Sequence, residues 1–207
     1  MRILFQGDSI TDADRSRTDD TRLGRGYPLL VESALSLAEP TKYQFVNRGI
    51  SGNRIVDLYA RIKCDIINLK PDVMSILIGV NDVWHDLGES PNGVDADKFF
   101  KIYSMLIEEV KEALPDIKIM ILEPFVLEAC STTEHWDFFK AEVQKRAEMA
   151  KRIAEKYSLP FIPLQKGFDE LATKAPNNYW LGDGVHPTPA GHEYIKAQWL
   201  NAFNSLS

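Results

Sequence analysis

Short apolar segments rich in β-branched residues alternate along the chain with longer segments in which apolar residues recur at three- and four-residue spacing. Continuous apolar runs are typical of strands buried on both faces of a sheet, and the longer periodicity is typical of amphipathic helices. The expected strands are 1–5, 43–47, 73–78, 118–122 and 160–163. The expected helices are 28–38, 56–68, 96–114, 134–157 and 189–204. This alternation predicts a single α/β domain over residues 1–207, a three-layer α/β/α sandwich around a five-stranded parallel sheet.

Two polar segments, 12–26 and 86–97, contain Gly or Pro and show no periodicity, so we expect long loops there. A chain of 207 residues with 44% hydrophobic residues can fill one continuous core. Its net charge of −6 is spread without a basic stripe, which argues against nucleic acid as a partner. No stretch approaches the ~20 apolar residues of a membrane span, and the first residues do not resemble a signal peptide. We therefore expect a cytoplasmic protein without a membrane span.

The two cysteines, Cys64 and Cys130, have no partners at metal-ligand spacing and are expected to be free thiols. The histidines His85, His135 and His192 show no spacing that would complete a metal site. We expect them at the surface or on helices, without a catalytic role. The sequence predicts neither a metal nor another cofactor.

A serine directly follows the first predicted strand, in the segment Gly7-Asp8-Ser9-Ile10, and Asp183 and His186 share one turn near the other end of the chain. Serine at its ordinary pKa is a poor nucleophile. It needs an imidazole to accept its proton and a carboxylate to hold that imidazole in the right tautomer. These residues are therefore candidates for nucleophile, base and orienting acid, although Ser9 alone would also suit a helix N-cap.

Gly52 follows the second predicted strand and Asn81 follows the third, just as Ser9 follows the first. The carboxyl ends of parallel strands meet at one edge of an open sheet, and ligands bind at that edge. Gly52 offers a backbone N–H with no side chain in the way. Asn81 offers an amide donor that is neutral at every working pH.

Four blocks thus stand in order along the chain: Gly7-Asp8-Ser9-Ile10, the segment 47–53, Gly79-Val80-Asn81-Asp82 and Asp183-Gly184-Val185-His186-Pro187. Over nearly the whole chain they resemble the SGNH hydrolase family, also called GDSL esterases. The resemblance implies a flavodoxin-like fold in which Ser9 is the nucleophile and His186 is the base, oriented by Asp183. It also implies an oxyanion hole made by the N–H groups of Ser9 and Gly52 and the side-chain amide of Asn81.

The segments 10–12, 49–53 and 79–84 are similar to those of intracellular bacterial acetylxylan esterases, which remove acetyl groups from xylo-oligosaccharides. This resemblance implies a small acyl pocket and a small-molecule ester substrate. The leading prediction is a serine esterase for short-chain acyl esters, chiefly acetyl esters of xylo-oligosaccharides or related carbohydrates. A lysophospholipase or acyl thioesterase of the same fold is the alternative. One departure stands out, because those esterases carry a tryptophan immediately before the catalytic aspartate and this chain carries Gly182.

Four further residues near the blocks are candidates for substrate contact, and each also has a structural explanation: Asp8, Arg54, Trp84 and Trp180. Adjacent side chains usually project in different directions, which favours a loop-fixing role for Asp8. Arg54 suits either a buried structural cation or a substrate contact. A tryptophan at the rim can stack on a sugar ring or simply pack against its neighbours.

A different class of function, a non-catalytic binder of carbohydrate or nucleotide, is also compatible with a flavodoxin-like sheet. The chain lacks Gly-x-Gly-x-x-Gly and the lysine-bearing phosphate loop that a nucleotide binder of this kind would use. Similarity to the deacetylases suggests a homo-oligomer, with the loop 86–97 as a candidate contact.

Overall fold

The computed structural model describes residues 1–206, and its five strands form one sheet in which every neighbouring pair is parallel. The strands are β1 (Arg2–Gly7), β2 (Gln44–Asn47), β3 (Val73–Leu77), β4 (Lys118–Leu122) and β5 (Phe161–Ile162). Their order across the sheet is β2-β1-β3-β4-β5. The strand order therefore reverses between β1 and β3, because β2 lies on one side of β1 and the later strands lie on the other. A reversal of this kind opens a crevice at the carboxyl ends of the strands, where ligands bind in open α/β sheets. The predicted five-stranded parallel sheet is confirmed.

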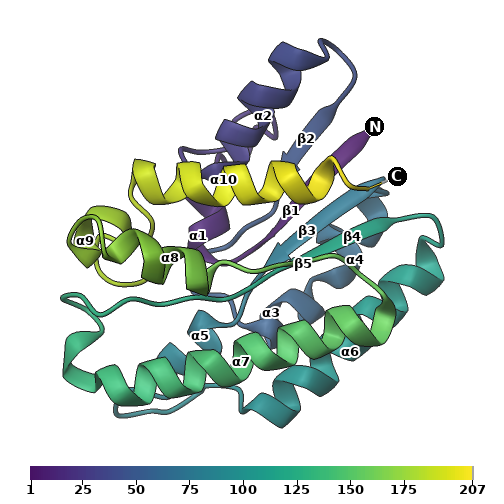
Figure 1. Cartoon of the computed structure of the whole chain (residues 1–207). Helices are drawn as coiled ribbons and strands as arrows, with labels where there is room; N and C mark the ends of the chain where they lie inside the picture. The colour runs from purple at the N-terminus through teal and green to yellow at the C-terminus, as the bar shows by residue number, and fades with distance from the viewer. Residues whose placement is uncertain (207) are drawn as a thin grey trace.

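Helices cover both faces of the sheet, with α2, α8 and α10 on one side and α3, α4 and α6 on the other (Figure 1). The helical elements on the amino-terminal side of β4 are α1 (Ser9–Asp12), α2 (Tyr27–Ala38), α3 (Ile55–Ala60), α4 (Ile62–Asp65), η1 (Ile67–Leu69), α5 (Val80–Trp84) and α6 (Ala96–Ala113). Those after β4 are η2 (Thr133–His135), α7 (Trp136–Tyr157), α8 (Gln165–Ala172), α9 (Asn177–Trp180) and α10 (Pro189–Phe203). These layers are the predicted α/β/α sandwich.

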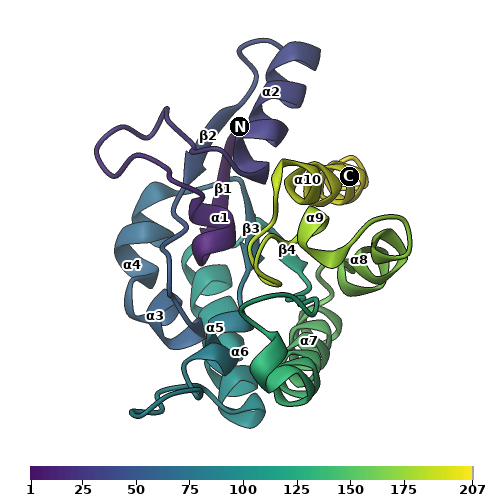
Figure 2. The same cartoon turned by 90° about the vertical axis from the view of Figure 1, so that its left-hand side faces the viewer.

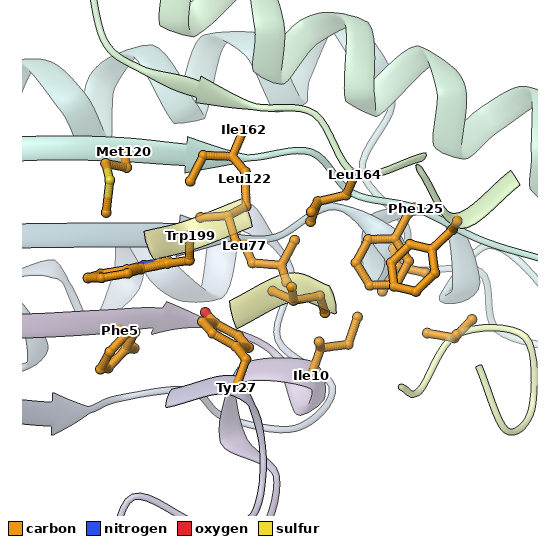
Figure 3. Close-up of a cluster of buried hydrophobic side chains, with 14 of the residues drawn as sticks. Phe5, Ile10, Tyr27, Leu77, Met120, Leu122, Phe125, Ile162, Leu164 and Trp199 are labelled. Atoms are coloured by element: carbon orange, nitrogen blue, oxygen red, sulfur yellow. The ribbon is translucent and has the colours of Figure 1, made fainter. Parts of the chain in front are cut away.

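Alternation along each strand divides the core into two clusters, one on each face. Ile3 and Phe5 of β1 face α2 and α10, and Phe5 packs on Trp199 with ring centroids 5.5 Å apart (Figure 3). Leu4 faces the opposite way, into the cluster formed with α3 and α6. Because both faces are buried, the strands read as continuous apolar runs rather than as alternating ones.

The expected helix over 56–68 was wrong as a single element, since the structure breaks it into α3, α4 and η1. The break lies at Arg61, whose guanidinium donates to the backbone oxygens of Arg48 (2.8 Å) and Gly7 (3.3 Å) and to Asn53 Oδ1 (2.9 Å). Gly7 is the last residue of β1, and Arg48 and Asn53 lie in the loop after β2. Tertiary hydrogen bonds therefore interrupt a pattern that is helical in its local spacing.

The short helices α8 and α9 were not expected from the sequence. Phe168 is the only residue that α8 buries fully, and α9 buries none. Elements of this length leave too little apolar periodicity to detect.

Candidate active site

Ser9 is the first residue of α1, directly after β1 at the edge of the sheet that Figure 2 shows nearest the viewer. The side chain of Asp8 caps this helix by accepting the N–H of Ile10 at 3.0 Å. Ile10 is only 2% exposed and packs into the core on the α10 side (Figure 3). A capped turn with a buried anchor thus fixes Ser9 at the end of the strand.

Asp183 and His186 form a turn that holds its own geometry. One carboxylate oxygen of Asp183 accepts the backbone N–H groups of Val185 (2.9 Å) and His186 (2.8 Å), and the other lies 2.7 Å from His186 Nδ1. Gly184 has φ +102°, and a Cβ there would lie 2.6 Å from the backbone oxygen of Leu127. Only glycine fits this left-handed, crowded position.

The segment after β4 anchors the same turn from outside. Leu127 donates its N–H to the backbone oxygen of Gly184 at 2.9 Å, and Ser131 donates to that of Asp183 at 3.0 Å. The segment after β4 therefore positions a turn that begins 21 residues beyond β5, the last strand of the sheet.

The turn brings His186 to Ser9 across 177 residues of sequence, with Ser9 Oγ 2.8 Å from His186 Nε2. The carboxylate of Asp183 assigns the ring proton to Nδ1, which leaves Nε2 free to accept the serine hydroxyl proton. Burial opposes ionisation of Asp183, but its bonds from the His186 ring and from two backbone N–H groups prevail and lower its pKa to about 2. In return, the hydrogen bond to Asp183 raises the pKa of His186 above its ordinary value.

The expected oxyanion donors follow β1, β2 and β3, three strands that are adjacent in the sheet. Gly52 has φ +81°, and a Cβ there would meet only open space. The N–H groups of Ser9 and Gly52 donate to no other group within residues 1–206. Asn81 uses one amide N–H to bind the backbone oxygen of Asn53 at 3.2 Å and has a second N–H to offer.

A cavity of about 430 Å³ opens beside Ser9 and His186. Its walls come from α1 and the start of α10, and from the loops after α1, after β2 and before α10. The lining residues are Ser9, Ile10, Ala13, Asp14, Arg25, Ser51, His186, Pro187, Pro189 and His192. Several of these side chains are polar, so the cavity offers hydrogen bonds as well as apolar contact.

None of the four expected substrate contacts lines this cavity. Asp8 is 1% exposed, and burial raises its pKa to about 7. Arg54 pairs with Asp57 at 2.9 Å and donates to the backbone oxygen of Asn92, which ties α3 to the loop after α5. The side chains of Asp8 and Arg54 therefore both bind backbone groups of segments around the site.

The two tryptophans lie in different surroundings. The ring of Trp84 is 6.2 Å from that of His186 and meets Phe139 edge-on at 5.4 Å, so it flanks the imidazole. Trp180 packs against Tyr179 at 4.8 Å and against the core beneath α9. Of the two, only Trp84 is beside the candidate catalytic groups.

Sequence reasoning missed four polar side chains that line the cavity, Asp14, Arg25, Ser51 and His192. His192 was expected at the surface or on a helix; it lies on α10 but is 7% exposed and faces the cavity. The available signal was its place in the first turn of a helix that starts just after His186. Within residues 1–206, no three His, Cys, Asp or Glu side chains converge as metal ligands.

A parallel α/β sheet that carries a hydrogen-bonded serine, histidine and aspartate at its carboxyl edge is typical of ester hydrolases. Residues 5–194 match the sequence profile of the GDSL-like lipase/acylhydrolase family. The chain belongs to this family of carboxylic ester hydrolases.

Relatives of known name support the same assignment. An acetylxylan esterase of Geobacillus stearothermophilus is 33% identical over 206 residues, which cover 96% of this chain and 92% of the relative. The crystal structure of the acetylxylan esterase Axe2 from that organism has a TM-score of 0.86 at 32% identity, covering 97% of this chain and 93% of Axe2. A Parabacteroides merdae protein named as GDSL-like has a TM-score of 0.90 at 34% identity, with 98% and 95% covered.

The membrane question has a direct structural answer for the described residues. No helix within residues 1–206 combines the length and the apolar character needed to cross a bilayer.

Proposed function

We propose that this protein removes acetyl groups from acetylated carbohydrates, xylo-oligosaccharides among them, through an acetyl-enzyme formed on Ser9. The observation that carries the proposal is the continuous path from Ser9 Oγ to His186 Nε2 (2.8 Å) and from His186 Nδ1 to Asp183 (2.7 Å). The substrate class is supported by the 33% identity to an acetylxylan esterase over almost the whole chain.

In the first step, Ser9 Oγ attacks the acetyl carbonyl carbon while His186 Nε2 takes the hydroxyl proton. The carbonyl oxygen becomes negative, and the N–H groups of Ser9 and Gly52 with the amide of Asn81 stabilise it. Each such donor contributes roughly 3 kcal/mol to transition-state stability in other serine hydrolases. When the intermediate collapses, the C–O bond to the sugar breaks and His186 gives its proton to the sugar oxygen.

In the second step, water attacks the acetyl-enzyme while His186 takes one of its protons. The second tetrahedral intermediate collapses with return of that proton to Ser9 Oγ, and acetate leaves. Asp183 holds the imidazole in the required tautomer and stabilises the imidazolium that forms in both steps. No other group has to change its protonation state.

Variants of Axe2 support these roles by residue type. Two solved structures are catalytic mutants of that enzyme, in which a serine or an aspartate is replaced by alanine. A serine and an aspartate are the two residue types that flank His186 in this site.

One residue of Axe2 has no counterpart at the corresponding place in this chain. In Axe2 a tryptophan directly precedes the aspartate that is replaced in the catalytic mutant, and a variant of this tryptophan has also been solved. In this chain Gly182 takes that place, is exposed, and has nothing closer to its would-be Cβ than 3.8 Å.

The test is acetate release from acetylated xylo-oligosaccharide by the wild-type protein, with the Ser9→Ala variant as the blank. The matched control is Ser131→Ala. Ser131 lies beside the turn that carries Asp183 and His186, and its side chain has no role in the proposed chemistry. We expect release to vanish in Ser9→Ala and to persist in Ser131→Ala. A protein that cleaves a simple aryl acetate but releases no acetate from the sugar would contradict the carbohydrate substrate.

The cytoplasmic location and the homo-oligomer stay predictions from the sequence.

A further inference from the structure

The cavity beside Ser9 contains a second imidazole that the proposed mechanism does not use. His192 lies in the first turn of α10, six residues after His186, and its side chain lines the same cavity. At 7% exposure it is enclosed by protein on nearly all sides. For a buried imidazole, the hydrogen-bond partner of each of the two ring nitrogens has to be identified.

The hydrogen bond to Nδ1 determines the tautomer of His192. The backbone N–H of Tyr27 donates to Nδ1 at 3.1 Å, so this nitrogen carries no proton. Burial, reinforced by the positive charges of Arg25 and His186, lowers the pKa of His192 to about 4. At neutral pH the ring is therefore uncharged, and its single proton lies on Nε2.

The Nε2–H group has no acceptor within residues 1–206. The fully buried side-chain nitrogen and oxygen atoms that lack a partner belong to other residues, for example the indole nitrogens of Trp180 and Trp199. The Nε2–H of His192 therefore keeps contact with the space of the cavity. It is a donor in a fixed place on the wall of the cavity that Ser9 also lines.

The surroundings hold this donor rigidly. The rings of His192 and Tyr27 stack with centroids 6.5 Å apart, and a Cβ on Gly26 would lie only 3.0 Å from the His192 ring. Asp14, Arg25 and Ser51 add further polar groups to the same cavity. Such a wall matches a ligand with several oxygen atoms at fixed positions better than it matches an alkyl chain.

We infer that His192 is a specificity-determining residue whose Nε2–H binds an oxygen of the carbohydrate part of the substrate. This inference rests on the proposed function and deepens it. A sugar hydroxyl or ring oxygen satisfies the donor, whereas an ester whose alcohol part lacks oxygen leaves it unpaired in a desolvated site. His192 thereby selects sugar acetates over simple acetates without taking part in proton transfer.

Two substitutions separate this role from the structural one. In His192→Asn the amide oxygen can still accept the N–H of Tyr27, but no donor reaches the place of Nε2. In His192→Gln the longer amide reaches that place, but the bond from Tyr27 is lost. The substrates are acetylated xylo-oligosaccharide and phenyl acetate, whose leaving group has no oxygen beyond that of the ester bond.

We expect His192→Asn to lower kcat/KM for the acetylated sugar by roughly three- to tenfold, the worth of one neutral hydrogen bond, mainly through KM. The same variant should change kcat/KM for the aryl acetate by less than about twofold. His192→Gln should retain more of the sugar activity than His192→Asn, even though its thermal unfolding midpoint is lower.

Two outcomes overturn the inference while leaving the proposed function intact. One is an equal loss on both esters in each variant. The other is sugar activity that is spared in His192→Asn and lost in His192→Gln, which would follow the bond to Tyr27. A wild-type protein that cleaves the aryl acetate but not the sugar ester overturns the proposed function and this inference together.

Discussion

Asn81 donates a side-chain N–H to the backbone oxygen of Asn53, 3.2 Å away. This bond joins the helix after β3 to the loop after β2, which carries Gly52. The next residue, Asp82, strengthens the link by accepting the N–H of Ile55 at 3.1 Å. The segments that carry two candidate oxyanion donors, Gly52 and Asn81, are thus tied to each other by hydrogen bonds.

Replacing Asn81 should impair the chemical step more than substrate binding. We expect Asn81→Ala to lower kcat by about 10²- to 10³-fold with little change in KM, because the donor acts on charge that develops in the transition state. The control is Asn53→Ala, which keeps the backbone oxygen that Asn81 binds. Steady-state kinetics with an aryl acetate measure both variants, and a rise in KM with unchanged kcat would contradict the oxyanion role.

Removing the carboxylate of Asp183 should change both the rate and its pH dependence. The pKa of His186 is raised by Asp183, and His186 acts as a base only when neutral, so wild-type activity should fall as pH drops through that raised pKa. We expect Asp183→Asn to lower kcat by up to about 10⁴-fold. Its residual activity should persist to lower pH than in the wild type, as kcat/KM profiles would show. An unshifted acid limb would contradict the pairing.

The buried carboxyl of Asp82 should make stability depend on pH. Burial raises its pKa to about 8, so the folded protein keeps a proton that the unfolded chain releases near pH 4. This contribution to stability is present below pH 4 and is lost as pH rises through 8. An Asn side chain has no such proton to lose, and its amide oxygen can still accept the N–H of Ile55.

The free energy of unfolding of Asp82→Asn should therefore rise relative to the wild type between pH 5 and pH 8, by about 1 kcal/mol or more. Urea unfolding at several pH values measures the difference. A difference that stays constant over this range would show that Asp82 does not titrate in the folded protein.

The turn that carries Asp183 and His186 should tolerate an added methyl group at Gly182 but not at Gly184. Gly184→Ala places a Cβ 2.6 Å from the Leu127 oxygen at φ +102°, and we expect it to cost about 1–3 kcal/mol of stability. Activity should fall with it because His186 moves. Gly182→Ala is the matched control, since the nearest atom to its Cβ is 3.8 Å away. Thermal unfolding and aryl acetate hydrolysis should separate the two variants.

Acyl chain length should distinguish a deacetylase from the alternative enzymes. Polar side chains such as Arg25 and His192 line the cavity beside Ser9, and a long alkyl chain there would cover these polar groups without pairing them. We expect kcat/KM to fall steeply along aryl acetate, butyrate and octanoate, by about tenfold or more overall. Rates that rise with chain length would favour the lysophospholipase or acyl thioesterase instead.

Much of this structure could be predicted from the chain alone. The five strands, the parallel sheet and the family follow from periodicity and from four ordered blocks. The helix expected over 56–68 is broken in the structure because Arg61 bonds to the end of β1 and to the loop after β2. The two short helices after β5 were not predicted because each buries so few side chains.

The sequence by itself determined the alternation of strands and helices, the serine that follows β1 and the Asp183–His186 turn, because these depend on spacing within a few residues. Only the tertiary structure decided which side chains share the cavity. His192 looked like an ordinary helix residue, and its neutrality, its tautomer and its free Nε2–H all come from Tyr27 and from burial against α2. Burial and charge are properties of neighbours in space, and a parallel sheet assembles those neighbours from segments far apart in the chain.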